Sequence, residues 1–171
     1  MEISRAQLAD AEAIARLVNH AFRNERFFID EDRTNPDKVR EFLQQGTFLL
    51  VREDGALAGC VYAELRGERG YFGLLAVDPT KQRSGLGSRL MSAAEQYCRE
   101  AGCQFMDLTV VNLRKELPDF YRRRGYTENG TEPFPAAAQA KMPCHLVRMS
   151  KPIHSAELLD WNFCLNYTGL P

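Results

Sequence analysis

A glycine-containing loop ahead of a helix is the stretch of this sequence best suited to bind an anion. Residues 74–87 read LLAVDPTKQRSGLG, an apolar strand that leads through a polar loop into a helix. Gly85 and Gly87 leave backbone N–H groups uncovered at the positive end of that helix, and Arg83 lies beside them. These features predict a phosphate site, although a tight turn without a ligand would use the same glycines.

Two other kinds of phosphate-binding loop do not match these residues. A P-loop has a lysine followed by serine or threonine after its second glycine, and no such pair follows Gly87. Leu90 stands where a dinucleotide fingerprint has its third glycine. The loop therefore favours neither a nucleoside triphosphate nor NAD.

Two carboxylates elsewhere are candidate proton acceptors. Asp107 interrupts the apolar run 105–108, and burial there would raise its pKa and make it a better base. A structural aspartate bonded to backbone is the alternative. Glu64, late in a predicted strand, is the rival base, acting directly or through a water, and a solvated charge at a strand end is the alternative for it.

Hydrophobic periodicity predicts the elements that position these residues. Strands are expected over residues 2–5, 47–53, 56–66, 71–77, 104–111, 126–131 and 145–150, and helices over 11–22, 35–46, 85–101 and 117–124. Asp10 is the expected N-cap of the first helix, and Asp54-Gly55 predicts a tight hairpin. The three strands before the glycine loop form an antiparallel meander. The helix after that loop lets strands 71–77 and 104–111 lie parallel through a crossover.

Two motifs at their usual separation carry a family resemblance. Residues 77–87 (VDPTKQRSGLG) resemble the acyl-CoA signature of the GNAT superfamily of N-acyltransferases, and residues 120–126 (FYRRRGY) are typical of a second segment of that superfamily. The resemblance covers residues 2–151. It implies an α/β (α+β) fold in one domain, residues 1–151, with a mixed sheet of six to seven strands, about four helices and splayed parallel central strands.

The resemblance also implies roles for individual residues. The backbone of the strand end would pair with pantetheine, the loop would hold the pyrophosphate, and an asparagine after the next strand would contact the cofactor. These cofactor-binding residues are Leu75, Ala76, Val77, Gln82, Arg83, Ser84, Gly85, Leu86, Gly87, Ser88 and Asn112. Tyr121 would protonate the departing thiolate, because a phenol is neutral at physiological pH. Asp107 matches the place of a glutamate base in some relatives of this superfamily.

The implied activity is direct transfer of the acetyl group of acetyl-CoA to a primary amine of a small molecule or peptide, with no metal. A catalytically silent acyl-CoA-binding sensor or assembly module is the alternative, and it would gain nothing from Tyr121. Glu25, the run 30–32 and the pair Phe27-Phe28 form an acidic and aromatic patch that we expect to attract a cationic amine. The run 122–124, three arginines, is expected to be a solvated helix face near the outer phosphate of the cofactor.

The composition of the chain limits its expected partners, location and cysteine chemistry. The chain has 171 residues, 44% hydrophobic, with a net charge of -1, which predicts neither nucleic-acid nor membrane partners. Its first residues lack the order of a signal peptide, so a cytoplasmic location is expected. Five scattered cysteines predict reduced thiols rather than disulfides or a zinc site. The apolar tail 152–171 is expected to pack on its own domain or on a second subunit, as in a homodimer.

Overall fold

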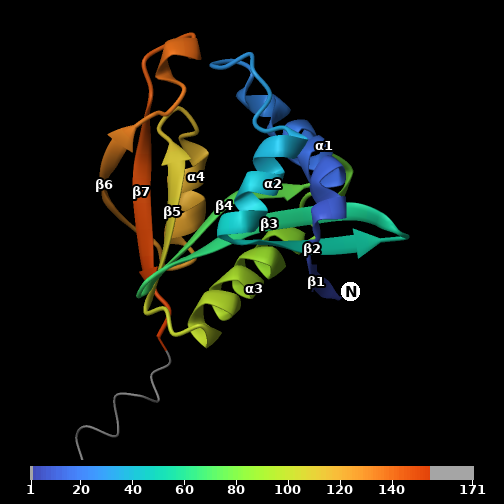
Figure 1. The fold of residues 1–171 in the computed structure, drawn as a ribbon. Coiled ribbons are helices and arrows are strands. Elements are labelled where there is room, and N and C mark those ends of the chain that lie inside the picture. Colours follow the sequence, from blue (N-terminus) through green and yellow to red (C-terminus); the bar gives the residue numbers. More distant parts are fainter. Residues whose placement is uncertain (1, 155–171) are drawn as a thin grey trace, which may run out of the picture.

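A computed structural model describes residues 2–154 as a seven-stranded mixed sheet with helices on both faces (Figure 1). The strands are β1 (Ile3–Arg5), β2 (Thr47–Glu53), β3 (Ala56–Arg66), β4 (Arg69–Val77), β5 (Phe105–Val111), β6 (Thr127–Pro133) and β7 (His145–Pro152). The α-helices are α1 (Ala11–Ala21), α2 (Pro36–Gln45), α3 (Leu86–Glu100) and α4 (Glu116–Arg122). The predicted fold class is confirmed.

The strand order, β1-β2-β3-β4-β5-β7-β6, places the only parallel pair among the described strands at the centre of the sheet. β4 and β5 are joined by the crossover helix α3, and their pairing covers just three positions, the last being Tyr71 opposite Asp107. Leu74 then takes a left-handed φ of 47° within β4. Beyond Tyr71 the two strands diverge, which confirms the predicted splay.

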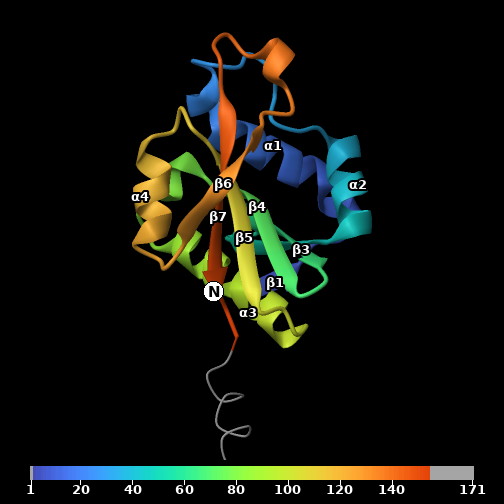
Figure 2. The same cartoon turned by 90° about the vertical axis from the view of Figure 1, so that its left-hand side faces the viewer.

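Helices cover the two faces of the sheet separately (Figures 1 and 2). On one face α1 and α2 pack with Phe48 and Tyr62, and on the other α3 packs with Phe72 and Tyr121. A third, smaller cluster joins the segment after α1 to the connection between β6 and β7, because Phe28 packs there. The isolated bridge between Ile29 and Ala140 ties the same two segments together.

Local chemistry explains where the first elements begin and end. The Asn35 side chain accepts the Lys38 N–H at 2.9 Å and so caps α2 at the predicted start. Asp54 and Gly55 have φ angles of 51° and 79°, as the hairpin prediction requires. Asp10 occupies the predicted N-cap position of α1, but its side chain accepts the Gln7 N–H instead of a helix amide. A short 3-10 turn over residues 8–10 therefore precedes α1.

The domain boundary predicted after residue 151 falls within the last described strand and stays a prediction. β7 continues to Pro152, and the rest of the predicted tail from residue 155 onward lies outside the described residues. The packing of that tail, a homodimer and a cytoplasmic location stay predictions. Among the described residues, Cys60, Cys98 and Cys103 are buried free thiols, and Cys144 is a partly buried one. Within residues 2–154, no helix is both long and apolar enough to cross a lipid bilayer.

Candidate active site

Two cavities meet where β4 and β5 diverge. Cavity A, about 870 Å³, lies on the face covered by α1 and α2 and is lined by residues such as Phe42 and Arg69. Cavity B, about 610 Å³, lies on the face of α3 and α4 and is lined by residues such as Leu86 and Tyr121. Side chains and backbone that line both cavities include Glu25, Arg33, Tyr71, Leu74, Thr109 and Leu146. The gap in the sheet is therefore a passage between two separate sites.

The glycine loop lines cavity B at the start of α3. Gly85 is the N-cap with φ 83°, and Arg83 before it has φ 67°. No side chain among the described residues caps α3, and a Cβ at Gly85 would meet nothing within 4 Å. The first amides of α3 and Arg83 thus line the same cavity, and together they are the donor set that a phosphate group needs.

Most of the predicted cofactor-binding residues line cavity B. They are Leu75, Val77, Gln82, Arg83, Gly85, Leu86, Gly87 and Ser88. Three others do not. Ala76 is buried on the α1 face, and the Ser84 hydroxyl donates to the Lys81 carbonyl at 2.7 Å. Asn112 accepts the His145 N–H at 2.9 Å, so it closes the end of the β5–β7 ladder instead of reaching the cavity.

Tyr121 projects from α4 into cavity B. Only 7% of the residue is exposed, and its ring packs against Phe72 and Tyr126. Its hydroxyl has no hydrogen-bond partner in residues 2–154, yet every fully buried side-chain oxygen there has one, so the hydroxyl faces the cavity. Burial raises the pKa of Tyr121 to about 12, which keeps the phenol protonated at neutral pH.

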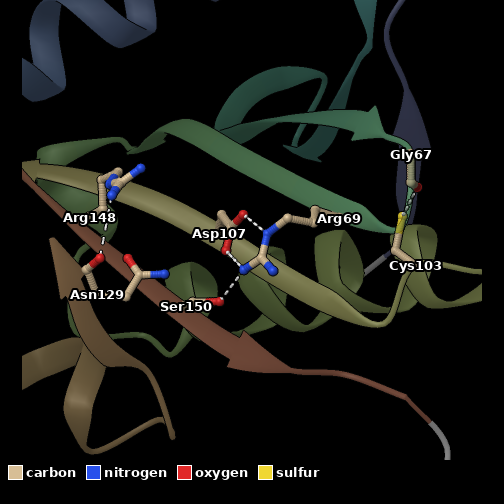
Figure 3. Close-up of polar contacts among 7 residues, drawn as sticks. All are labelled: Gly67, Arg69, Cys103, Asp107, Asn129, Arg148 and Ser150. Atoms are coloured by element: carbon tan, nitrogen blue, oxygen red, sulfur yellow. Dashed lines mark hydrogen bonds and ion pairs between the residues drawn. The ribbon is translucent and has the colours of Figure 1, made fainter. Parts of the chain in front are cut away.

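Asp107 lines cavity A but is held by Arg69 (Figure 3). The Arg69 guanidinium donates to both carboxylate oxygens, at 2.5 and 2.6 Å, and also to the Ser150 hydroxyl at 2.7 Å. Burial pushes the pKa of Asp107 upward, but the hydrogen bonds and charge of Arg69, with Ser150, outweigh it and leave the pKa lowered. The expectation of a raised pKa is therefore wrong.

Glu64 lines neither cavity. Its carboxylate accepts two hydrogen bonds from Arg66, at 2.8 and 3.0 Å, and one from the Tyr62 hydroxyl at 3.1 Å. The hydrogen bonds from Arg66 lower its pKa against the opposing effect of burial. A carboxylate stabilised in its charged form is a weak proton acceptor, so neither carboxylate singled out in the sequence has the environment of a base.

Comparison with known proteins assigns this arrangement to a family. The model of the acetyltransferase (GNAT) family matches residues 11–126, which is more than half of the chain. The chain belongs to the GNAT family. An amino-acid acetyltransferase of Azotobacter vinelandii is 30% identical over 104 residues, which cover 58% of this chain and 23% of that relative. This chain thus spans about a quarter of the length of that protein.

Solved structures show the same GNAT fold. The ribosomal-protein-S18-alanine N-acetyltransferase of Escherichia coli superposes with a TM-score of 0.73 at 17% identity, covering 91% of this chain and 95% of its own. A putative acetyltransferase of Salmonella typhimurium, solved with acetyl-CoA, superposes with a TM-score of 0.69 at 19% identity, covering 90% and 94%. At these identities the likeness shows the fold alone.

Besides the predicted Arg83, three arginines of this GNAT chain line cavity B, namely Arg33, Arg114 and Arg124. Arg124 stacks its guanidinium 3.7 Å from the centre of the Phe120 ring and donates to the Ser88 hydroxyl at 2.8 Å. Its position three residues after Tyr121, just past the end of α4, was the available signal. Arg114 lies in the turn before α4. Arg122, by contrast, is the solvated side chain predicted, paired with Asp119 and Glu128.

Some residues of the predicted acidic and aromatic patch line cavity A, and others have structural contacts outside it. Glu25, Glu31 and Asp32 line cavity A. Asp30 forms an ion pair with Lys141 at 2.6 Å and helps to fix the segment. Phe28 is fully buried, and its ring centre lies 6.0 Å from that of Phe134.

Proposed function

We propose that this GNAT protein moves the acetyl group of acetyl-CoA directly to a primary amine while both substrates are bound. The observation that carries the proposal is the meeting of cavities A and B at the divergence of β4 and β5. Because the cavities lie on opposite faces of the sheet, donor and acceptor can be present together, and their reacting groups can meet at the gap. No acetylated enzyme is needed in such an arrangement.

Cavity B suits the acetyl donor. Open amides at the start of α3 and the neighbouring Arg83 would hold the pyrophosphate, and the unpaired edge of β4 beyond Tyr71 offers backbone groups to the pantetheine arm. N–H groups at the gap would stabilise the oxyanion that develops on the thioester. The free Tyr121 hydroxyl supports its role as the acid that protonates the leaving thiolate.

Cavity A suits a small polar acceptor. Six cationic and six anionic side chains line it, so it favours an acceptor that carries charges of both signs over a simple polycation. Within residues 2–154, Arg148 donates only to the Asn129 carbonyl, at 3.4 Å, so its guanidinium is available to a carboxylate (Figure 3). Together with the amino-acid acetyltransferase among the relatives, this makes amino acids the first acceptors to test.

The test follows thiol release from acetyl-CoA with amino acids, their decarboxylated amines, polyamines and peptides. Wild type should turn over at least one acceptor, and Tyr121→Phe should lose about 100-fold in kcat with its affinity for acetyl-CoA unchanged. Tyr97→Phe, which removes a phenol hydroxyl on α3 outside both cavities, is the matched control. It should retain wild-type rates.

The competing proposal is a silent acyl-CoA sensor. It predicts tight acetyl-CoA binding by wild type, no thiol release with any acceptor and no effect of Tyr121→Phe. That set of results would contradict the transfer reaction.

A further inference from the structure

A buried carboxylate lies at the junction of the two cavities, and no step of the transfer reaction described so far uses it. Glu25 ends the 3-10 helix η2 (Phe22–Glu25), which follows α1 directly. We propose that Glu25 is the general base that takes a proton from the ammonium group of the acceptor. This inference rests on the acetyl transfer proposed above.

The position of Glu25 supports this role. The residue is 6% exposed and lines both cavities, whereas Asp107 lines only cavity A and Glu64 lines neither. Atom Oε1 is 3.4 Å from Nη1 of Arg114, and Oε2 has no hydrogen-bond partner in residues 2–154. Since no fully buried side-chain oxygen among those residues lacks a partner, Oε2 faces open space at the junction.

Burial leaves Glu25 more basic than Asp107 and Glu64, whose pKa values are lowered. Burial raises the pKa of Glu25, and Glu116 adds a smaller upward effect. Arg33 and Arg114 oppose this, but their combined effect is weaker than that of burial, so the pKa stays above its ordinary value. A carboxylate with a raised pKa is the better match for deprotonating an amine near neutral pH.

Glu25 and Tyr121 together account for every proton that moves in the reaction. Glu25 accepts one proton from R–NH3+ and releases it to solvent, and the neutral nitrogen then bonds to the thioester carbon. When the carbon–sulfur bond breaks, the sulfur receives the phenolic proton of Tyr121. The second proton on nitrogen restores that phenol, directly or through water. The products are the acetylated amine, coenzyme A and one released proton.

Arg114 provides a matched pair of variants for the test. Arg114 contacts Glu25 and also donates a hydrogen bond to Glu116 at 2.6 Å. The Glu116 side chain is 62% exposed, and Glu116 lines neither cavity. Glu25→Gln and Glu116→Gln each remove one carboxylate beside Arg114, but only the first removes the proposed base. Steady-state rates are measured from pH 6 to 10 with the best acceptor of the panel and with a weakly basic analogue that is already neutral at pH 7.

We expect Glu25→Gln to lose about 100-fold in kcat/KM at pH 7, mostly in kcat, with unchanged acetyl-CoA affinity. The loss should shrink as the pH approaches the pKa of the amine, and it should nearly vanish with the weakly basic analogue. Glu25→Asp should recover part of the rate, and Glu116→Gln should match wild type.

Three results would overturn the inference. The first is Glu25→Gln with wild-type rates, the second a change in KM alone, and the third an equal loss with both amines. Each leaves the transfer reaction standing. If wild type binds acetyl-CoA but acetylates no amine, the transfer reaction fails, and the role of Glu25 fails with it.

Discussion

The guanidinium of Arg69 and the carboxylate of Asp107 form two hydrogen bonds between β4 and β5, in the short stretch where these strands still pair. The same guanidinium reaches the Ser150 hydroxyl on β7. Three strands are thereby joined at the closed end of the gap. The pair is thus better suited to hold the strands at that point than to accept a proton.

Asp107→Asn should lower the free energy of unfolding by about 1 kcal/mol at pH 7, a modest figure because both side chains are partly exposed. The folded pKa of Asp107 lies below its unfolded value, so this stabilisation is complete above the unfolded pKa and is lost as pH falls through the folded one. Denaturant unfolding from pH 7 down to about 2.5 should show wild type and variant converging in acid. A difference independent of pH would contradict the prediction.

Glu25→Gln should not destabilise the protein at pH 7. Because the folded pKa of Glu25 is raised, its contribution to stability is present below the unfolded pKa and lost as pH rises through the folded pKa. At neutral pH the buried charge therefore opposes folding, and a neutral amide removes it. Thermal unfolding should give an equal or higher midpoint for the variant. A clear drop would indicate a structural role for the carboxylate.

Gly85→Ala and Gly87→Ala should have opposite effects on stability. Gly85 has a left-handed φ of 83°, so alanine there should cost about 1 kcal/mol, and the turn should bind acetyl-CoA more weakly. Gly87 lies within α3, where an added Cβ meets only Val77 at 3.8 Å, so alanine should stabilise by up to about 1 kcal/mol. Denaturant unfolding measures both. If the two substitutions change the free energy of unfolding equally, a side chain at position 85 does not strain the turn.

Lys151→Met should lower the free energy of unfolding more than most substitutions that remove a single charge. The Lys151 amine donates to both oxygens of Glu95 at 3.0 and 2.9 Å, and the Tyr126 hydroxyl donates to one of them at 2.7 Å. Removing the amine leaves a carboxylate that is 8% exposed with one partner, at a cost of about 2 kcal/mol.

Arg40→Met is the matched control for the charge at Lys151. Arg40 pairs with the exposed Asp37 on α2, so this change should shift the free energy of unfolding by less than about 0.5 kcal/mol. Similar losses in the two variants would contradict the assignment of Glu95 to a buried network.

Features fixed by neighbouring residues were predictable from the sequence. The Asp54-Gly55 hairpin and the start of α2 at Asn35 depend on residues within three positions of one another, and both occur where predicted. The glycine loop follows the same logic, since its geometry depends on Gly85 and the start of α3.

The environments of the carboxylates were not predictable, because they depend on contacts distant in sequence. Asp107 reads as a lone charge in an apolar run, and only the fold brings Arg69 and Ser150 to it. Glu25 lies in a polar segment typical of a solvated loop. It is buried in a segment that Phe28 anchors against Phe134, more than a hundred positions away.

The brief pairing of β4 and β5 makes the middle of the sheet a weak seam between two larger blocks. Two blocks, one built on β1–β4 and the other on β5–β7, share only three paired positions along that boundary. A ligand that forms hydrogen bonds with the unpaired edges of both β4 and β5 would hold the two strands together. Because these edges exist only in the folded protein, the ligand would bind the folded state alone. The midpoint of thermal unfolding would then climb with ligand concentration, and amides of the two edges would exchange more slowly with solvent.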